Sequence, residues 1–122
     1  MQKTLPEHLG SAGWVGFDLD GTLAVYTGWK GPTHIGEPIL PMIAKVKELL
    51  KAGTDVRIFT ARVCSQCSPE ELEIAKETIK AWCKEHIGQE LLITAEKDWG
   101  MIEYYDDRAV GVEYNTGQIK GG

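Results

Sequence analysis

Residues 14–22 read WVGFDLDGT, and this stretch decides the fold that the sequence predicts. Its first four residues form an apolar run between two glycines, a pattern typical of a strand buried on both faces. Asp18 then lies at the carboxyl end of the strand, the edge where open α/β sheets bind ligands. Asp20 follows, and Gly21 supplies the backbone freedom for a turn that directs both carboxylates to one site. Since unpaired carboxylates repel each other, the stretch indicates a divalent cation or a shared proton.

The rest of the chain alternates predicted helices with predicted strands. One amphipathic helix is predicted over residues 38–52, and another begins at the capping box Ser68–Glu71 and ends at Gly88. Strands joined through helices pair in parallel by right-handed crossovers, so their carboxyl ends meet at one edge of the sheet. The predicted strands are residues 14–17, 55–60, 91–94, 102–105 and, as an edge strand, 110–114.

Length and composition indicate a single soluble domain. The chain has 122 residues with 43% hydrophobic side chains, which predicts one domain, assigned to residues 13–122. Residues 1–12 show no periodicity and contain glycine and proline, which predicts a loose N-terminal arm. No apolar run approaches the roughly 20 residues of a membrane span, and residues 1–10 lack a signal-peptide core. A cytoplasmic location is therefore expected, and three cysteines fit a reducing compartment. The net charge of -5 argues against a duplex DNA binder.

Four short motifs follow one another in a recognisable order. The first, D-x-D-G-T at Asp18–Thr22, resembles motif I of the haloacid dehalogenase (HAD) superfamily of aspartate-dependent phosphotransferases. The superfamily's three other motifs have matches downstream, each near the end of a predicted strand: Thr60 with Arg62 two residues on, then Lys97, then the pair Asp106–Asp107. The chain looks most like the small capless members that phages and prophages often carry.

The resemblance implies a fold and a reaction. The fold would be α/β, three-layered and Rossmann-like, with a mainly parallel five-stranded sheet and the loop 23–38 as a minimal flap in place of a cap domain. The reaction would be Mg²⁺-dependent hydrolysis of phosphate monoesters through an aspartyl-phosphate. The substrate would be a phosphorylated small molecule or a nucleotide, and the partner subunit of a homodimer is one candidate for covering the open site. No membrane partner is expected.

Each motif residue has an implied role. Asp18 would attack phosphorus, and Asp20 would give a proton to the leaving oxygen and take one from water. Thr60 would hydrogen-bond a phosphoryl oxygen, and Lys97 would neutralise phosphoryl charge. The implied Mg²⁺ ligands are Asp18, the carbonyl of Asp20, and Asp106 assisted by Asp107. Nearness to the predicted sheet edge adds four candidates for substrate contacts: Lys30, His34, Arg62 and Arg108. Trp29 is a fifth candidate, since it could stack on a base or sugar, although it could equally pack the flap down.

The same residues fit two other kinds of site poorly. An EF-hand starting at Asp18 needs glycine at position six and glutamate at position twelve, where the chain has Leu23 and Trp29. A receiver domain would be phosphorylated after the third strand, where the chain has Thr94. Two functional alternatives stay open: a phosphatase acting on nucleotides or nucleic-acid ends, and a non-catalytic module that binds metal or phosphate.

The cysteines raise one further possibility. Cys64, Cys67, Cys83 and His86 have the spacing of a zinc site. However, a helix over residues 69–86 would separate Cys83 from the helix start by roughly 20 Å. Cys83 is therefore expected in the core, while a disulfide between Cys64 and Cys67, or no role for them, stays open.

Overall fold

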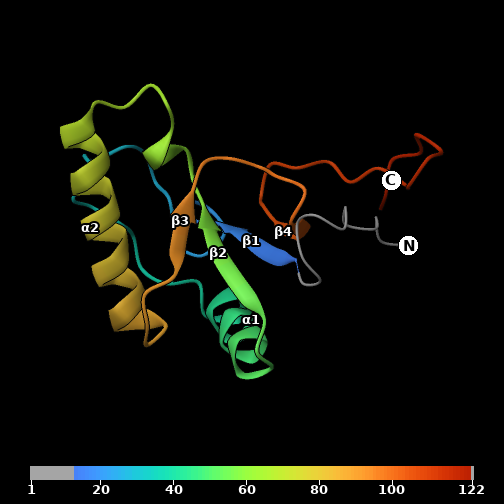
Figure 1. Ribbon diagram of the computed structural model, residues 1–122, viewed down its shortest axis with the longest axis horizontal. Coiled ribbons are helices and arrows are strands. Elements are labelled where there is room, and N and C mark those ends of the chain that lie inside the picture. Colours follow the sequence, from blue (N-terminus) through green and yellow to red (C-terminus); the bar gives the residue numbers. More distant parts are fainter. Residues whose placement is uncertain (1–12, 122) are drawn as a thin grey trace.

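The computed structural model describes residues 13–121, which form an α/β domain around one parallel sheet (Figure 1). The prediction of alternating strands and helices is confirmed. None of the helices over residues 13–121 is long and apolar enough to cross a membrane. The elements are β1 (Trp14–Asp18), α1 (Leu40–Lys51), β2 (Asp55–Phe59), the 3-10 helix η2 (Ala61–Val63), α2 (Pro69–His86), β3 (Leu92–Thr94) and β4 (Met101–Tyr105).

The sheet has the strand order β3-β2-β1-β4, and every pairing is parallel. β1 is central, and its register with β2 runs from Trp14 opposite Asp55 to Asp18 opposite Phe59. On its other side β1 pairs with β4, where Phe17 lies opposite Tyr105. The residues that follow β1, β2 and β4 therefore start from one edge of the sheet, as the sequence predicts.

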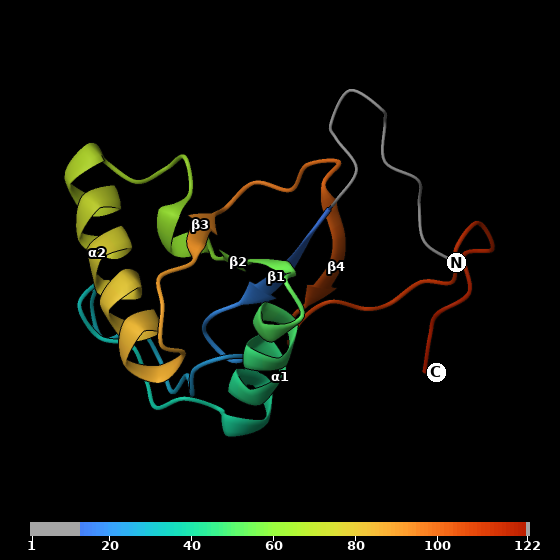
Figure 2. The ribbon, with the colours of Figure 1, turned by 60° about the horizontal axis from the view of Figure 1, so that its bottom comes forward.

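Both helices pack on the same face of the sheet. The core on that face contains Val15 and Phe17 of β1 and Ile58 of β2, together with Val46 of α1 and Ile79 of α2. Steps from β1 to β2 and from β2 to β3 go in one direction, so right-handed crossovers put both helices on one side. Figure 2 shows them there. The domain described by residues 13–121 thus has two layers, and the prediction of three layers is wrong for this part of the chain.

The predicted fifth strand is absent from residues 13–121. Residues 110–121 are exposed and bond to one another, through a bridge between Val112 and Ile119 and a hydrogen bond from the Glu113 amide to the Gln118 carbonyl (2.7 Å). Asn115, with φ of 61°, makes the turn between them. The segment leads away from the body of the domain (Figure 1). The backbone of residues 110–121 pairs within this local hairpin, so the segment adds no strand to the sheet, and Val110, Val112 and Tyr114 stay exposed.

The loop after β1 is irregular, as expected, but it is fastened to the core. Ala24 forms a bridge with Pro38, and the Trp82 indole nitrogen of α2 donates to the carbonyl of Gly36 at 3.0 Å. Its middle, residues 26–34, is largely exposed at the carboxyl edge of the sheet. These anchors fix where the exposed part of the loop emerges beside Asp20.

Candidate functional site

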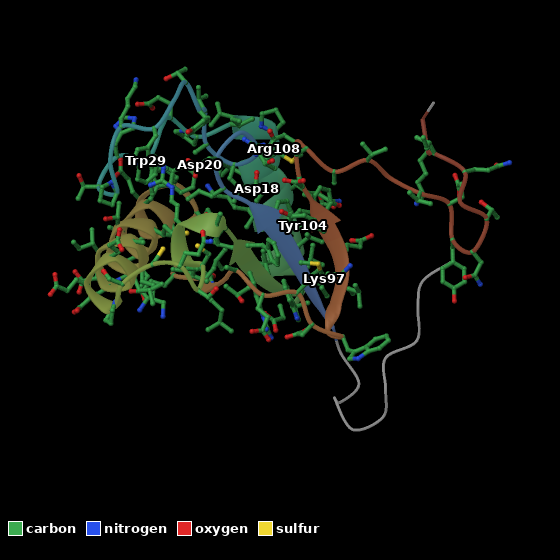
Figure 3. The ribbon with its side chains drawn as sticks, turned by 90° about the horizontal axis from the view of Figure 1, so that it is seen from above. Asp18, Asp20, Trp29, Lys97, Tyr104 and Arg108 are labelled. Atoms are coloured by element: carbon green, nitrogen blue, oxygen red, sulfur yellow. The ribbon has the colours of Figure 1, made fainter. Side chains whose placement is uncertain are left out.

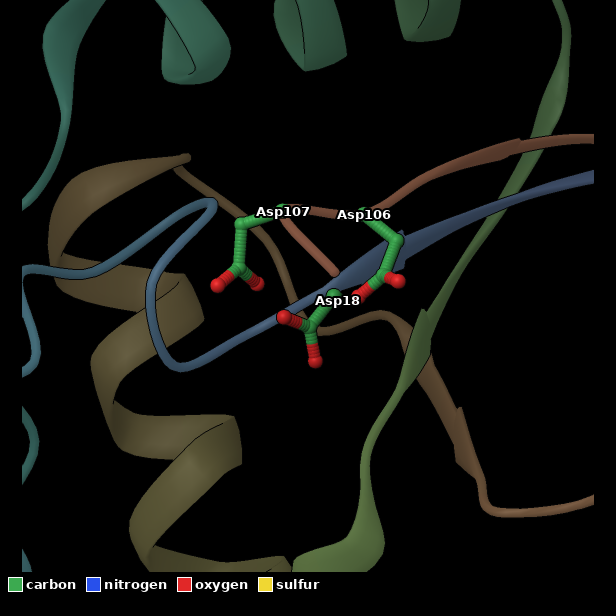
Figure 4. A group of neighbouring side chains, drawn as sticks. All are labelled: Asp18, Asp106 and Asp107. Carbon is green, nitrogen blue, oxygen red and sulfur yellow. The ribbon is translucent and has the colours of Figure 1, made fainter. Parts of the chain in front are cut away.

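Three carboxyl groups converge at the carboxyl edge of the sheet (Figure 4). Asp18 ends β1, and Asp106 and Asp107 follow β4 directly. One oxygen atom from each of the three lies within 4.8 Å of the others. The parallel pairing of Phe17 with Tyr105 sets this arrangement, because it places the next residue of each strand at the same edge. Among residues 13–121 this is the only group of three or more acidic, histidine or cysteine side chains that could hold a metal ion.

The acidic cluster, defined as Asp18, Asp106 and Asp107, cannot keep three negative charges near neutral pH by itself. Burial raises the pKa of Asp18 to about 7, helped by its hydrogen bond with Asp107 and by the charges of Asp106 and Asp107. The same hydrogen bond, as its largest cause, lowers the pKa of Asp107. The two opposite shifts share one cause, because the hydrogen bond between the two carboxyl groups favours a proton on Asp18 over a proton on Asp107. A divalent cation would replace that proton and stabilise the full charge of the cluster.

Thr22 and Gly21 shape the turn beside the cluster. The Thr22 hydroxyl lies 3.3 Å from Asp18 Oδ2 and 3.2 Å from Asp107 Oδ1, and it can donate to one of them at a time. Gly21 has φ of +92°, and a Cβ there would lie 2.8 Å from Asp107 Oδ2. Sequence reasoning gave Thr22 no role. Its position four residues after Asp18 in the first motif was the available signal.

Tyr104 is a second residue at the site that sequence reasoning missed. Burial raises its pKa, and the charges of Asp18 and Asp106 raise it further. Its ring meets Phe59 edge-on at 4.9 Å, on the face of the sheet away from the helices. The signal was its place two residues before Asp106, since alternate residues of a strand share a face.

Asp20 lies near the acidic cluster but is engaged elsewhere. Its two carboxylate oxygens accept hydrogen bonds from Arg62 Nε and Nη2, both at 2.8 Å. The Arg62 side chain is only 7% exposed, and its Nη2 also donates to the His34 carbonyl at 3.0 Å. The Trp29 ring lies over the guanidinium, with its centroid 4.9 Å from Cζ. Arg62 thus ties the predicted acid–base residue to the loop, and the Asp20 carboxylate is not part of the acidic cluster.

Three other predicted residues lie at the same edge. Thr60 directly follows Phe59, the partner of Asp18 in the sheet, and is 3% exposed. Its hydroxyl accepts from the Arg62 amide at 3.1 Å. The amide of Arg108 donates to Asp106 Oδ2 at 3.3 Å, which keeps Arg108 near the cluster (Figure 3). Lys30 is exposed in the loop, with no side-chain hydrogen bond or ion pair to residues 13–121.

Lys97 is not brought to the acidic cluster. Only residues 95–100 separate β3 from β4, and they must return from the carboxyl edge of the sheet to its amino edge. The neighbouring Asp98 accepts from the Trp14 indole nitrogen at 2.8 Å, at the start of β1. Figure 3 places Lys97 along the sheet toward that end, with Tyr104 between it and Asp18. The expectation that Lys97 meets Asp18 is therefore not met, because this connection has no helix to hold a lysine at the carboxyl edge.

The zinc interpretation also fails for residues 13–121. Cys64 and Cys67 lie before α2, with their sulfur atoms 3.9 Å apart. Cys83 is fully buried in the core, as predicted, and His86 packs against the Trp82 ring at 4.8 Å. The length of α2 separates the two cysteines before it from Cys83 and His86, and the acidic cluster is the only metal-type grouping in this part of the chain.

Comparisons with known proteins show the fold and no more. No family model matches the sequence, and no curated protein matches it. One solved structure is similar, described as the conserved protein coded by locus from Bacteroides thetaiotaomicron. It is 22% identical, covers 82% of this chain and 79% of its own, and has a TM-score of 0.55. At this identity the likeness supports the α/β architecture alone.

Proposed function

We propose that this protein is a divalent-cation-dependent hydrolase of phosphate monoesters in which Asp18 forms an aspartyl-phosphate. The observation that carries the proposal is the convergence of Asp18 with Asp106 and Asp107, from the ends of two paired strands. A carboxylate nucleophile beside further carboxylates is a chemical arrangement for phosphoryl transfer, where positioning and charge neutralisation supply most of the catalysis. The resemblance of the four motifs to the HAD superfamily supports the same reaction.

The donor set fits Mg²⁺, which prefers a few carboxylates together with waters and substrate oxygens. Asp18, Asp106 and Asp107 would hold the ion. Its positive charge would offset the negative charges of the cluster and of the phosphoryl group. The pKa of Asp18, raised to about 7, supports this fit, because it shows that three negative charges are unfavourable in the cluster without a cation.

The chain's own residues would carry the reaction in two displacements. A carboxylate oxygen of Asp18 attacks phosphorus, the ester P–O bond breaks, and the leaving oxygen takes a proton. Water then attacks the phosphorus of the aspartyl-phosphate, releasing phosphate and restoring Asp18. Asp20 would supply and recover the proton. Both of its oxygens now accept from Arg62, so this role requires the Asp20–Arg62 pair to open.

A non-catalytic module that binds metal and phosphate is the second candidate. Two observations favour it: Lys97 lies away from Asp18, and Asp20 is paired with Arg62. Such a module would keep the cation site of the acidic cluster and lack turnover.

Hydrolysis of p-nitrophenyl phosphate with Mg²⁺ or with EDTA separates the two functions. We expect activity that needs Mg²⁺ and that falls by at least about a hundredfold in Asp18→Asn, as for the loss of other catalytic nucleophiles. The matched control is Asp55→Asn, because Asp55 is an exposed aspartate at the other end of the sheet. That variant should retain full activity.

Calorimetric titration with Mg²⁺ completes the experiment. A wild-type protein that binds Mg²⁺ but hydrolyses nothing would establish the module. Equal rates in wild type and Asp18→Asn would refute catalysis by Asp18. Absence of Mg²⁺ binding would refute both functions.

A further inference from the structure

Trp29 is a large aromatic side chain that is exposed and yet held in place. Its exposed fraction is 59%, and one face of the ring rests on the Arg62 guanidinium at 4.9 Å. Arg62 is itself fixed by two hydrogen bonds to Asp20 and one to the His34 carbonyl. The ring is therefore oriented by its support while the Asp20–Arg62 pair is closed, and the hydrogen bond to the His34 carbonyl can hold the guanidinium under the ring when the pair opens. The exposed part of the ring is open to a ligand.

The location of Trp29 matches the side of the site where a leaving group would lie. In Figure 3 Asp20 lies between Trp29 and Asp18, and the contacts of Arg62 with both Asp20 and Trp29 agree with that order. In phosphoester hydrolysis the leaving oxygen lies at the proton donor, here Asp20, and the leaving group extends beyond it. Its next neighbour is the Trp29 ring.

Arg62 adds a hydrogen-bond donor at the same place. Its other terminal nitrogen, Nη1, is buried and has no hydrogen-bond partner among residues 13–121. A buried unpaired donor on a cation is costly. Because Nη1 is buried in this structure, it would become available to an oxygen acceptor of a ligand only when the Asp20–Arg62 pair opens. An aromatic surface beside a charged donor suits a planar group attached to an oxygen-rich one.

We propose that Trp29 is a stacking platform for a nucleobase and that the substrates are nucleoside monophosphates; this rests on the hydrolysis proposed above. The phosphoryl group would lie at Asp18, the ester oxygen at Asp20 and the base on the exposed part of the Trp29 ring. The net charge of -5 favours a mononucleotide over a long polyanion.

The test compares kcat/KM for adenosine 5′-monophosphate and ribose 5-phosphate, which differ by the base. We expect wild type to prefer the nucleotide by about 5- to 150-fold, the range of stacking contributions. Trp29→Ala should abolish the preference by raising KM for the nucleotide, and Trp29→Phe should restore part of it. Trp99→Ala is the matched control, since Trp99 is 63% exposed in the segment between β3 and β4.

Equal kcat/KM for the two esters in wild type, or an unchanged preference in Trp29→Ala, would overturn the stacking role. Calorimetric binding of adenosine 5′-monophosphate keeps this result distinct from failure of the hydrolase proposal. An inactive wild type whose nucleotide affinity falls in Trp29→Ala would refute hydrolysis and support stacking. An inactive wild type without nucleotide binding would refute both.

Discussion

Asp18 shows how one residue can depend on neighbours that are distant in the sequence. Burial is the largest cause that raises its pKa, and the next is the hydrogen bond with Asp107, which lies 89 positions away in the chain. Thr22 offers its hydroxyl to the same two carboxyl groups. The charge state of the proposed nucleophile therefore depends on the turn after β1 and on the end of β4 together.

Gly21 gives a prediction at this scale. Gly21→Ala should lower the free energy of unfolding by about 1–2 kcal/mol, the cost of a side chain in left-handed backbone, because φ there is +92°. It should also weaken Mg²⁺ binding, since the new Cβ would lie 2.8 Å from Asp107 Oδ2. Urea unfolding and calorimetric titration measure the two effects.

Gly28→Ala is the control for that experiment. Gly28 has φ of +118° but no atom within 4 Å of an added Cβ, so the variant shares the backbone strain without the clash. It should lose stability and keep its Mg²⁺ affinity. Equal loss of affinity in both variants would show that Gly21 acts through general destabilisation.

At the scale of elements, the N-terminus of α2 is fixed by a complete capping box. The Ser68 hydroxyl accepts from the Glu71 amide at 3.2 Å, and the Glu71 carboxylate accepts from the Ser68 amide at 2.8 Å. Pro69 occupies the first turn, as the capping-box pattern predicts. Ser68→Ala should lower the free energy of unfolding by about 0.5–2 kcal/mol. Urea unfolding measures the loss, and Ser65→Ala, at an exposed serine in the preceding turn, should show none.

The capping box also sets a pH dependence. Its hydrogen bonds with Ser68 lower the pKa of Glu71 below the ordinary value of 4.5. The folded state thus binds the proton less tightly than the unfolded chain, so the contribution of Glu71 to stability is present above pH 4.5 and is lost as pH falls through its lowered pKa. Unfolding of wild type and Glu71→Ala should differ most near neutral pH and converge in acid. A constant difference would contradict this.

The short connection between β3 and β4 explains why Lys97 lies away from Asp18. Residues 95–100 cross the sheet on the face away from the helices, as Figure 2 shows, and the Gly100 carbonyl accepts from the Trp14 amide at 2.7 Å. This strap leaves the carboxyl edge after Thr94, and by Asp98 it has reached the start of β1, where the Asp98 carboxylate accepts from the Trp14 indole nitrogen. Lys97, the residue before Asp98, therefore lies away from the carboxyl edge.

At the scale of the whole molecule, the sheet is covered by helices on one face only. Parallel sheets are usually covered on both. Here the second face carries its own aromatic contacts, between Phe59 and Tyr104 and between Arg57 and the Trp14 ring at 4.7 Å. The strap from residue 95 to residue 100 covers Trp14, which is only 2% exposed. Aromatic side chains and the strap thus bury part of the face that a third layer of helices would otherwise cover.

The exposed C-terminal hairpin gives a prediction about the whole domain. Deleting residues 110–122 should shift Tm by less than about 4 °C, equivalent to under about 1 kcal/mol for a domain of this size. The reason is that residues 110–121 are exposed and bond among themselves. Ile58→Ala in the core should instead cost about 2–5 kcal/mol. A large Tm drop on deletion, measured by calorimetry, would show that the hairpin supports the domain.

The sequence by itself determined the elements and the parallel direction of β1 and β2. Apolar runs, a capping box and glycine stops are local signals, and they placed α1, α2 and the four strands close to their observed bounds. The helical connection between β1 and β2 also predicted that Asp18 and Thr60 lie at one edge, whereas the place of the pair Asp106–Asp107 at that edge was implied by the resemblance of the motifs. The fifth strand was wrong since a short apolar alternation fits a local hairpin equally well.

Only the tertiary structure decided which side chains meet. The pairing of Asp20 with Arg62, the stacking of Trp29 on that arginine and the distance of Lys97 from Asp18 depend on side-chain directions and on how far a short connection can reach. Motif order carries neither kind of information. Neighbourhood across strands is set by backbone hydrogen bonds that any sequence can make, whereas contacts between side chains depend on the particular residues that pack around them.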